Sequence, residues 1–535
     1  MAKRALLLDD ADNCVVAIEP VNAGDEVTYE GGHVVARATV GLGHKLAARA
    51  IAAGEKILKY GAPIGSARRA IAAGDHVHSH NLASDYIVGF HFEGAGATTA
   101  PAAVADAAPD AEAVASPAAT AATPPSGGRA APRRAYDDSR LQGYLRQDGR
   151  LGIRNRVLVI YLVECAHHVA RQIADAFDGD VEYLGFAGCY PSDYAYRLVR
   201  GLATHPNVGG VVLVSLGCEC FDRVRLTQDI EASGRPCCGV VIQENGGTAG
   251  SVEVGRRMVS ELRALIAGTP RAPLRLRDLV VGTVCGGSDG TSGITGNPAV
   301  GRAFDILLGR GATCVFEESG ELIGCESHMM ARAATPAARS AIESAMDKAT
   351  RYYSTMGLGS FSDGNAVGGL TTQEEKSLGA YAKSGASPIT GVLLPTERPP
   401  SPGLYLMDVV PDGEPRFGYP NICDTAEIIE LIATGCHMVV FTTGRGSVIG
   451  SAIAPVIKVC NNPETYRHMA DDMDVDAGRI ISEGASLDEV ADDIVRCIAE
   501  VAAGGLSCGE RLGHVEYALT YKRFDYATAD LPCQG

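Results

Sequence analysis

From residue 143 onwards, short and fully apolar runs alternate with segments of helical periodicity. Residues 157–177 read as an apolar strand that continues into an amphipathic helix. Four further apolar runs end in turns that contain Gly or Cys: 208–219, 237–247, 278–290 and 437–447. Strands that are apolar throughout and alternate with helices are typical of a parallel sheet buried on both faces. The pattern therefore predicts a large, mostly parallel α/β region, which we divide into subdomains at 138–270 and 271–535.

The first 93 residues follow a different pattern of short alternating runs. An Ala-Gly turn followed by an acidic residue occurs within 17–27, 47–61 and 71–81. Repeated turns between short strands predict a small all-β domain over 1–93. Residues 94–137 are rich in Ala and Pro, and they have almost no large apolar side chains with which to build a core. We expect this segment to be a flexible tether.

Composition narrows the classes of partner. The chain of 535 residues is 46% hydrophobic and 21% charged, so it can bury large cores. A net charge of −17 argues against nucleic acid and anionic membranes, and an anionic substrate must then be held by local cations. No apolar stretch is long enough to cross a bilayer, which takes about 18 residues or more. We expect a cytoplasmic protein whose 16 cysteines are not disulfide-bonded.

His76, His78 and His80 occupy alternate positions in the run GDHVHSHN. On a strand their imidazoles would project from one face, about 7 Å apart. His44 and Lys45 lie nearby in the sequence. The pattern predicts a strand that binds a metal or an anion, and the alternative is a solvated edge strand.

Several polar residues stand beside the predicted strands of the first α/β subdomain. Arg154 and Asn155 precede its first strand, where they could bind a carboxylate or fix a loop. Cys218 and Glu219 follow another strand, and a thiolate and a carboxylate together suit a divalent transition metal such as iron. Gln243 ends a third strand and is a candidate for binding substrate.

Residues 284–298 form a dense glycine-rich loop that includes Ser288 and Asp289. Such a loop presents backbone N–H groups to an anion, but it lacks the lysine of a P-loop and the GxGxxG of a dinucleotide site. Thr443 and Arg445 end a later strand, where an arginine offers two parallel hydrogen bonds to a carboxylate or sulfonate. We predict that these side chains bind a small acidic substrate at the carboxyl ends of the strands.

Lys376 follows two glutamates in the segment 364–379. A lysine in a partly dry pocket can be a general base or can hold a carboxylate. The alternative is an ordinary charged position on the surface of a helix.

Together these motifs resemble the altronate/galactarate dehydratase superfamily. GHKLA (43–47), KYGAPIG (59–65) and GDHVHSHN (74–81) resemble its small β-clip domain of the SAF type. DGRLGIRN, SLGCE, CGGSDGTSGIT, GGLTTQEEKSLG, GCHMVVFTTGRG and MDVDAGRI resemble its catalytic region. The resemblance covers nearly the whole chain except the tether.

Other segments, including YLVECAHHVAR, GCYPSDYA and EESGELIGCE, are more similar to the large subunit of the (2R)-sulfolactate sulfo-lyases. In those enzymes the SAF-type piece is usually a separate subunit, so here the two would be fused. The dehydratases usually carry a lysine in the turn that reads GNAVGG here, where Val367 stands. This departure favours a substrate other than a hexonate.

The resemblance implies a lyase that eliminates a group from C3 of a small 2-hydroxy acid and yields a 2-keto acid. The preferred reaction converts (2R)-3-sulfolactate to pyruvate and sulfite. The alternatives are dehydration of altronate or galactarate and, in another class, non-enzymatic binding of sugar acids. We expect a homo-oligomer that binds neither nucleic acid nor membrane.

The resemblance also implies a divalent metal, Fe²⁺ in the first instance, with Mn²⁺ or another ion as alternatives. His78 and His80 are the expected ligands, with Cys218 and Glu219 as weaker candidates. His44, His78 and Lys376 are the expected catalytic residues, with Lys376 as base. The histidine strand would form one wall of a site shared with the large region. An iron–sulfur cluster is a less favoured alternative that would need four cysteines to converge: Cys165, Cys189, Cys218 and Cys285.

Overall fold

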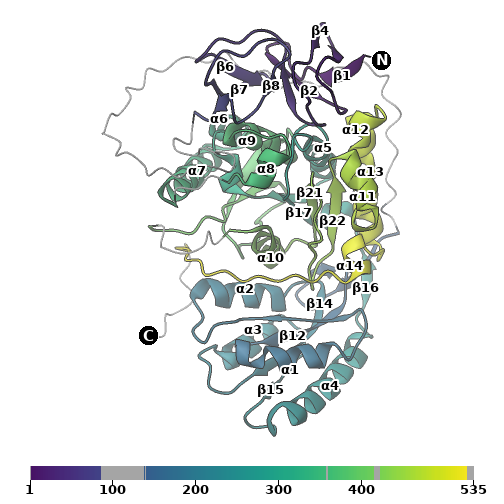
Figure 1. Cartoon of the computed structure of the whole chain (residues 1–535). Helices are drawn as coiled ribbons and strands as arrows, with labels where there is room; N and C mark the ends of the chain where they lie inside the picture. Colours follow the sequence, from purple (N-terminus) through teal and green to yellow (C-terminus); the bar gives the residue numbers. More distant parts are fainter. Residues whose placement is uncertain (1, 86–137, 139, 357–359, 415–421, 527–535) are drawn as a thin grey trace. The chain divides into compact units, whose positions relative to one another are not determined.

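The computed structural model describes residues 2–85, 138, 140–356, 360–414 and 422–526. The chain divides into two compact units, residues 1–135 and 136–535, and each is described by itself (Figure 1). The tether expected at 94–137 lies outside the described residues.

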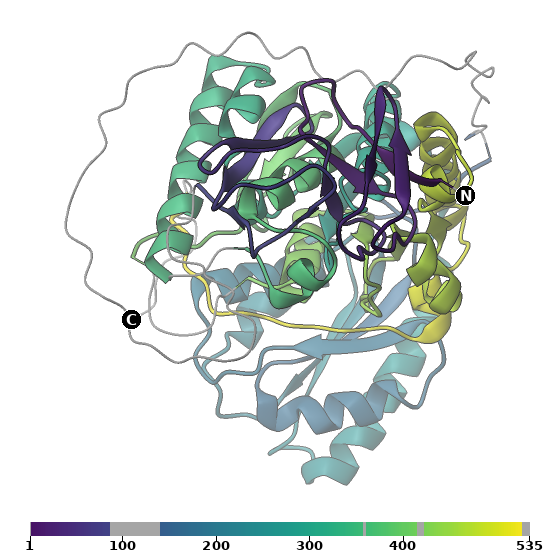
Figure 2. The same cartoon turned by 45° about the horizontal axis from the view of Figure 1, so that its top comes forward.

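In the small unit, purple in Figures 1 and 2, the described residues 2–85 form short strands joined by turns. Its first sheet has the order β4-β3-β1-β2-β5-β8 and its second the order β6-β7-β9. All the pairs in these two sheets are antiparallel except β1 with β3. The small all-β domain is confirmed. Its strands are β1 (Lys3–Leu6), β2 (Cys14–Ala17), β3 (Glu26–Tyr29), β4 (Gly32–Val35), β5 (Lys45–Ala47), β6 (Lys56–Lys59), β7 (Ala62–Ala67), β8 (His76–Val77) and β9 (Leu82–Ala83).

The repeated Ala-Gly turns of the small unit share one local structure. Each glycine has a positive φ, 90° at Gly24, 80° at Gly54 and 82° at Gly74, which suits a residue without a Cβ atom. The acidic residue after each glycine accepts a hydrogen bond from the backbone N–H three residues earlier. The third of these turns leads directly into His76.

The large unit contains two separate parallel sheets, which confirms the expected α/β class. A four-stranded sheet has the order β13-β12-β14-β15 and a seven-stranded sheet the order β19-β20-β18-β17-β21-β22-β23. Their strands are β12 (Arg156–Tyr161), β13 (Val181–Gly185), β14 (Val208–Ser215), β15 (Cys237–Val241), β17 (Val280–Cys285), β18 (Thr313–Phe316), β19 (Ile389–Leu393), β20 (Leu404–Met407), β21 (Met438–Thr443), β22 (Val456–Cys460) and β23 (Val475–Asp476). A small antiparallel sheet of β10 (Gln142–Leu145), β11 (Leu151–Gly152) and β16 (Arg271–Pro273) completes the unit.

Helices cover both faces of each parallel sheet. On β12, alternate residues face either a core with α1 and α4 or a second core with α2 and α10. The second core is shared with the seven-stranded sheet, whose other face is covered by α5 and α13. The longer helices are α1 (Glu164–Ala174), α2 (Asp193–Ala203), α3 (Arg223–Ala232), α4 (Gly247–Ile266), α5 (Gly296–Leu308), α7 (Pro336–Met356), α9 (Gln373–Tyr381), α10 (Asp424–Thr434) and α13 (Leu487–Ala502). The short helices are η1 (Leu276–Asp278), η2 (Ser319–Leu322), α6 (Glu326–Ala331), α8 (Asp363–Val367), η3 (Ala382–Ser384), α11 (Pro463–His468), η4 (Ala470–Asp472), α12 (Arg479–Ser482) and α14 (Cys508–Leu512).

The strand order of the seven-stranded sheet reverses between β17 and β21. The chain leaves β17 for β18 and later returns to the other side of β17 as β21. Open α/β sheets bind ligands outside the carboxyl ends of their strands at such a reversal. We therefore expect a ligand-binding site at the loops that follow β17 and β21.

The C-terminal segment, yellow in Figures 1 and 2, runs along α2. Its Phe524 packs against Tyr194, and its Tyr526 lies against Arg197. Among the described residues, no helix is both long and apolar enough to cross a bilayer.

Candidate functional site

Three histidines of the small unit form a compact group, which we call the histidine cluster. One nitrogen from each of His44, His76 and His78 lies within 4.8 Å of one from each of the others. Nδ1 of His44 and Nε2 of His76 are hydrogen-bonded at 3.1 Å, and the rings of His44 and His78 stack with centroids 5.5 Å apart. Burial first, and then the charge of His78, lower the pKa of His76 to about 3. His76 is thus a neutral imidazole, the form that ligates metals.

Strand register and one turn produce this cluster. β5 and β8 are antiparallel, with Leu46 opposite His76 and Lys45 opposite Val77. Continuing this register by one residue brings His44 opposite His78. The expected strand over 76–80 stops at Val77, because Asn81 closes a turn there. The Asn81 side chain accepts the N–H of His78 at 2.9 Å and donates to the carbonyl of His76 at 2.9 Å.

His80 lies at the margin of the histidine cluster. Its ring centroid is 5.7 Å from that of His76 and 6.4 Å from that of His78. It does not belong to the close group of three nitrogens, whereas His76 does. Three imidazoles suit iron and related divalent metals, and three protein ligands leave coordination positions open. The donor set of the cluster therefore fits the kind of metal that the sequence suggests.

The large unit gathers lysines and carboxylates at the carboxyl ends of β17 and β18. The members come from four helices and from the residues that follow β18, and we call them the lysine–carboxylate cluster. They are Glu318, Glu321, Lys376, Lys383, Asp424 and Glu427, with Cys285 at the end of β17 beside them.

Two ion pairs organise this cluster. Nζ of Lys376 lies 2.6 Å from Glu321, and Lys383 forms an ion pair with Glu318. The backbone N–H of Cys285 donates to Glu318 at 2.8 Å, and its thiol donates to Glu321 at 3.1 Å. Both lysines are buried, with Lys383 at 0% exposure, so each ammonium group is held where water screens it little.

Asp424 is the accessible carboxylate of the cluster, since it is half-buried at the first turn of α10. A side chain at position 286 would collide with the Asp424 carboxylate, so Gly286 permits their close approach. Burial, and then the charge of Glu321, raise the pKa of Asp424 to about 6. Burial and Asp424 together raise the pKa of Glu427, which is one turn further along the helix. A carboxyl group whose pKa is close to neutral can both accept and donate a proton at physiological pH.

Glu318 has the left-handed backbone conformation, with φ of 82°. This conformation is uncommon for a residue with a side chain and costs of order 1–3 kcal/mol. Its carboxylate is held by Lys383 and by the N–H of Cys285. These two contacts hold Glu318 in the strained conformation, at the point where the sheet edge and the cluster meet.

Two further groups in this cluster have donor atoms close enough for a metal: Cys285 with Glu318 and Glu321, and Glu318 with Asp424 and Glu427. Lysines already pair with Glu318 and Glu321. Burial, and then Glu321, raise the pKa of the Cys285 thiol to about 12, which keeps it protonated. The histidine cluster therefore fits a resident metal better than either of these groups.

The glycine-rich loop after β17 is tied to the turn after β21, as the strand reversal predicts. The backbone N–H groups of Gly444 and Arg445 donate to the carbonyl of Gly287 at 3.2 and 2.9 Å. Asp289 is buried and accepts hydrogen bonds from Thr291 and Asn462. These hydrogen bonds indicate that Asp289 stabilises the conformation of the loop.

Four residues predicted to bind substrate, Ser288, Asp289, Thr443 and Arg445, thus lie at one place. Ser288 is buried, and its carbonyl accepts from Asn365 at 2.9 Å. Thr443 accepts the N–H of Gly446 at 3.0 Å. Arg445 is exposed, and its guanidinium donates to the carbonyl of Gly364 at 2.8 Å. Of the four, only Arg445 has an exposed side chain, so it is the one that can contact a ligand arriving from solution.

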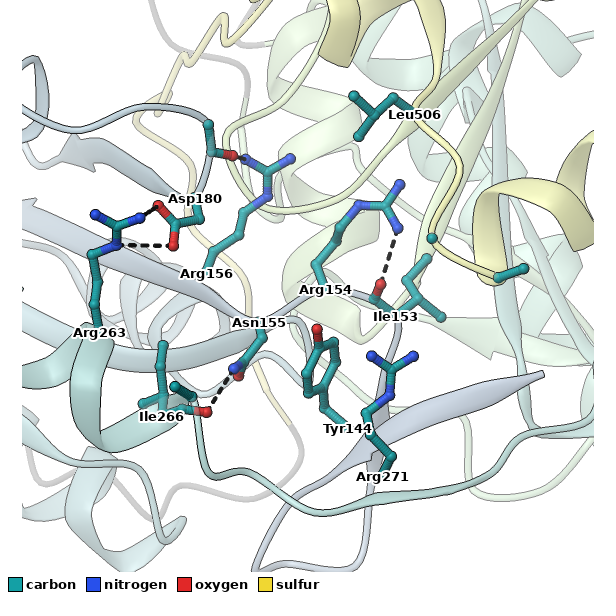
Figure 3. Close-up of a pocket in the computed structure, with 14 residues that line it drawn as sticks. Tyr144, Ile153, Arg154, Asn155, Arg156, Asp180, Arg263, Ile266, Arg271 and Leu506 are labelled. Carbon is teal, nitrogen blue, oxygen red and sulfur yellow. Dashed lines mark hydrogen bonds and ion pairs between the residues drawn. The ribbon is translucent and has the colours of Figure 1, made fainter. Parts of the chain in front are cut away.

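Arg154 and Asn155 lie elsewhere, along a pocket of about 530 Å³ at the amino-terminal end of β12 (Figure 3). Arg154 pairs with both oxygens of Glu510 at 2.8 Å and also donates to the carbonyls of Val501 and Gly505. The Asn155 amide donates to Ile266 and its oxygen accepts from Arg146. These contacts hold the end of α13 and α14 against β12, which is the loop-fixing role that we gave as the alternative to binding a carboxylate.

Cys218, Glu219 and Gln243 lie together at the carboxyl ends of β14 and β15, on the four-stranded sheet. The Glu219 carboxylate accepts from the Ser215 hydroxyl and from the backbone N–H groups of Gly217 and Cys218. Burial alone would raise its pKa, but these hydrogen bonds lower it. Glu219 therefore closes its own turn, and it shares no close metal-binding group with Cys218 in the described part of the chain.

The four cysteines considered for an iron–sulfur cluster belong to different sheets. Cys165, Cys189 and Cys218 are exposed at the four-stranded sheet, whereas Cys285 is buried at the end of β17. Within the ranges that the structure describes, no group of close metal-binding side chains combines them.

Sequence reasoning missed most of the lysine–carboxylate cluster. Of its members the sequence predicted Lys376 alone, and it omitted His76 from the predicted metal ligands. Glu318 and Glu321 directly follow the apolar run that forms β18, which is a signal of the kind used for other strand ends. Lys383, Asp424 and Glu427 lie inside or beside helices, where the local sequence gives no such signal.

Comparison with known proteins agrees with this architecture. Three family models match: the altronate/galactarate dehydratase SAF domain over residues 3–85, the D-galactarate dehydratase/altronate hydrolase second domain over 143–267, and the D-galactarate/altronate dehydratase C-terminal domain over 276–524. Altronate dehydratase of Escherichia coli (strain K12) is 29% identical over 528 residues, which cover 95% of this chain and 97% of that protein.

Both subunits of a (2R)-sulfolactate sulfo-lyase from Chromohalobacter salexigens are also similar. Its subunit beta is 34% identical over 391 residues, which cover 71% of this chain and 96% of that subunit. Its subunit alpha is 36% identical over 87 residues, which cover 14% of this chain and 89% of that subunit. The chain thus matches, in one polypeptide, two proteins that are separate there.

Proposed function

This chain belongs to the altronate/galactarate dehydratase family and is a lyase, and we propose that it converts (2R)-3-sulfolactate to pyruvate and sulfite. In this reaction the C2 proton is removed and its electron pair forms a C2=C3 bond. Sulfite leaves from C3 with the C–S bonding pair, and the resulting enol tautomerises to the 2-keto acid.

The observation that carries the choice of leaving group is the higher identity to both sulfo-lyase subunits than to altronate dehydratase. Position 367 supports it. Val367 ends α8 and is 68% exposed, and the neighbouring Gly368 carbonyl accepts from Gly290 of the glycine-rich loop at 2.8 Å. The family's dehydratases usually carry a lysine in this turn, so the chain lacks there a cation that a longer polar substrate could use.

Arg445 and the glycine-rich loop suit an acidic substrate. The exposed guanidinium offers hydrogen bonds to a sulfonate or a carboxylate, and loop N–H groups can donate hydrogen bonds to the second anionic group. Because the chain as a whole carries a net charge of −17, such local donors must provide the attraction.

We assign proton removal from C2 to Asp424. It is the half-buried carboxylate of the cluster, and its pKa of about 6 leaves it ionised but basic at neutral pH. Lys376 and Lys383 would stabilise the negative charge that develops as the proton leaves. Lys376 then acts as a cation paired with Glu321, a different role from the base that its sequence context suggests.

The proposal includes a divalent metal, Fe²⁺ in the first instance, held by His44, His76 and His78. When bound, such an ion supplies Lewis acidity. The neutral state of His76 and the closeness of the three nitrogens support this assignment over His80.

A second candidate is a hydro-lyase acting on altronate or galactarate. The match along nearly the whole length of single-chain altronate dehydratase favours it. Hydroxide is a poor leaving group and needs a proton donor. The raised pKa of buried Glu427 would keep such a donor protonated. The similarity to lyases argues against non-enzymatic binding of sugar acids.

We propose that the protein is located in a reducing compartment such as the cytoplasm, because its cysteines are free thiols. All fifteen cysteines in the part of the chain that the structure describes are unbridged. Assembly into a homo-oligomer is likewise part of the proposal.

A substrate panel tests the assignment. The Fe²⁺-loaded chain is assayed under anaerobic conditions with (2R)-3-sulfolactate, altronate and galactarate, and kcat/KM is compared. We expect sulfolactate to exceed both hexose acids by at least tenfold. The reverse order would establish the hydro-lyase, and turnover of none of them would reject both reactions.

A further inference from the structure

Beside the lysine–carboxylate cluster lies a third ion pair, which is fully buried. Lys522 of the C-terminal segment and Glu430 of α10 are both 0% exposed. Nζ of Lys522 lies 2.8 and 3.0 Å from the two carboxylate oxygens, and the Tyr194 hydroxyl donates to one of them at 2.6 Å. Three hydrogen bonds to the Glu430 carboxylate therefore join α10 to α2 and to the C-terminal segment.

Glu430 continues a line of carboxylates along α10. Asp424, Glu427 and Glu430 are spaced three residues apart, so each is displaced by about 4.5 Å of helix rise from the one before. Residues at this spacing are neighbours on a helix surface. The line runs from half-buried Asp424 to buried Glu430. The charge of Glu430 raises the pKa of Glu427, and a carboxylate oxygen of Glu427 lies within 4.8 Å of one of Asp424.

Glu317 is a buried carboxyl group of this region that no cation among the described residues pairs with directly. It is 0% exposed, and neither of its carboxylate oxygens has a hydrogen-bond partner. An ionised carboxylate without a partner is very costly away from water, so Glu317 is held as the neutral acid. Burial, followed by the charges of Glu427 and Glu430, raises its pKa well above the usual range. The carboxylates here thus depend on a few lysines for their charge state.

We propose that Lys522 is a positioning residue for the elimination: by fixing the charge of Glu430, it sets the protonation of Glu427 and Asp424. The inference rests on the proposed function, because it concerns the proton-transfer residues of that site. The groups on surrounding elements that act on Asp424, Glu427 and Glu430 include Tyr194, Glu321, Lys376, Lys383, Asp408 and Lys522.

Two single variants should move the pH profile in opposite directions. Lys522→Met removes a cation, so the carboxylates of α10 hold their protons more tightly. The acid limb of kcat/KM should then move up by about one pH unit. Glu430→Gln removes an anion and leaves Lys522, so the limb should move down. The double variant removes the pair as a unit and should return the limb towards that of the unchanged chain.

A matched control separates this role from stability alone. Arg235 is buried and pairs with Asp148 at 3.1 Å beside the four-stranded sheet. Arg235→Met should lower the melting temperature without moving the acid limb. If Lys522→Met and Glu430→Gln behave like Arg235→Met, Lys522 is structural and the inference is overturned. If Lys522→Met does not fold, the other two variants still test the inference. Glu430→Gln must move the acid limb of kcat/KM to lower pH, and the double variant must leave it in place.

Failure of the proposed function can be recognised separately. If the unchanged chain turns over no hydroxy acid, the pH dependence of thermal unfolding replaces the kinetic profile. The loss of stability of Lys522→Met relative to the double variant should then grow as the pH rises from 5 to 8, because Glu430 without its lysine keeps its proton in the folded state and releases it on unfolding. A constant difference across this range would overturn the coupling.

Discussion

The ammonium group of Lys376 lies 2.6 Å from a carboxylate oxygen of Glu321, and both side chains are buried at the carboxyl edge of the seven-stranded sheet. The same glutamate accepts from the thiol of Cys285 at 3.1 Å. This pair joins α9 to η2 beside Asp424. Glu321 adds to burial in raising the pKa of Asp424, and Lys376 lowers it.

Replacing Lys376 by methionine should reduce kcat by about 10²-fold or more, the range of a lost proton-transfer or charge-stabilising group. KM should change less, because Arg445 and the glycine-rich loop remain. Lys348 offers a control, since it also pairs with buried carboxylate, at 2.7 Å from Asp408, but lies outside the cluster. Lys348→Met should lower the melting temperature and leave kcat within a few-fold. Equal losses of kcat in the two variants would contradict the assignment.

Asp424→Asn should abolish turnover and stabilise the fold above pH 6. Because the folded pKa of Asp424 is raised from 3.8 to about 6, the stability it allows is fully present below pH 3.8 and is lost as the pH rises through 6. The asparagine variant avoids this loss, so its advantage in melting temperature should appear between pH 4 and 7 and then level off. Exposed Asp471 provides the control: Asp471→Asn should keep its activity and its pH profile.

Metal analysis should separate the members of the histidine region. After loading with Fe²⁺ under anaerobic conditions, His76→Ala and His78→Ala should retain less than about a tenth of the iron, because each removes one of three ligands. His80→Ala should retain most of it. His33, exposed on β4, is the control within the same unit. Loss of iron in His80→Ala together with retention in His76→Ala would reverse the assignment.

Arg154 should matter for stability and not for substrate. Removing one partner of a buried ion pair costs about 3–5 kcal/mol, so Arg154→Met should lower the free energy of unfolding by that amount while KM stays unchanged. Arg445→Gln should do the opposite and raise KM at nearly constant stability, because Arg445 is exposed. Denaturant unfolding and steady-state kinetics on both variants check this contrast. A large rise in KM for Arg154→Met would restore the role expected from the sequence.

Val367→Lys tests the origin of substrate choice. The side chain at 367 is 68% exposed, so a lysine can be accommodated without disturbing the fold. It should raise kcat/KM for altronate or galactarate relative to sulfolactate, by about tenfold if the new cation holds one polar substrate group. Val367→Met, which adds length without charge, is the matched control. No change in the ratio would remove position 367 from the argument.

The sequence predicted the elements whose signal is local. The apolar runs at 157–177, 278–290 and 437–447 do form β12, β17 and β21, and the polar residues after the last two meet at the strand reversal. Parallel strands align their carboxyl ends, so a sequence position after a strand already indicates where a residue lies. The same reasoning applied to 208–219 and 237–247 placed Cys218 and Gln243 correctly at strand ends, but on the other sheet.

What the sequence could not give depends on long-range contacts. Lys383 and Glu318 are 65 residues apart and meet only after α9 and η3 pack on the sheet edge. Arg154 looked like a substrate ligand because its partner Glu510 is 356 residues away. The alternation of His76, His78 and His80 predicts one continuous strand, whereas the turn that ends β8 at Val77 depends on side-chain hydrogen bonds of Asn81.

The central claim, elimination of sulfite from a 2-hydroxy acid, is tested most directly by product stoichiometry. The Fe²⁺-loaded chain is incubated anaerobically with (2R)-3-sulfolactate, and sulfite and pyruvate are quantified over time. The account predicts that they appear together, one sulfite for each pyruvate, and that neither appears with Asp424→Asn. Absence of sulfite, with a 2-keto-3-deoxy acid formed from altronate or galactarate instead, would contradict it.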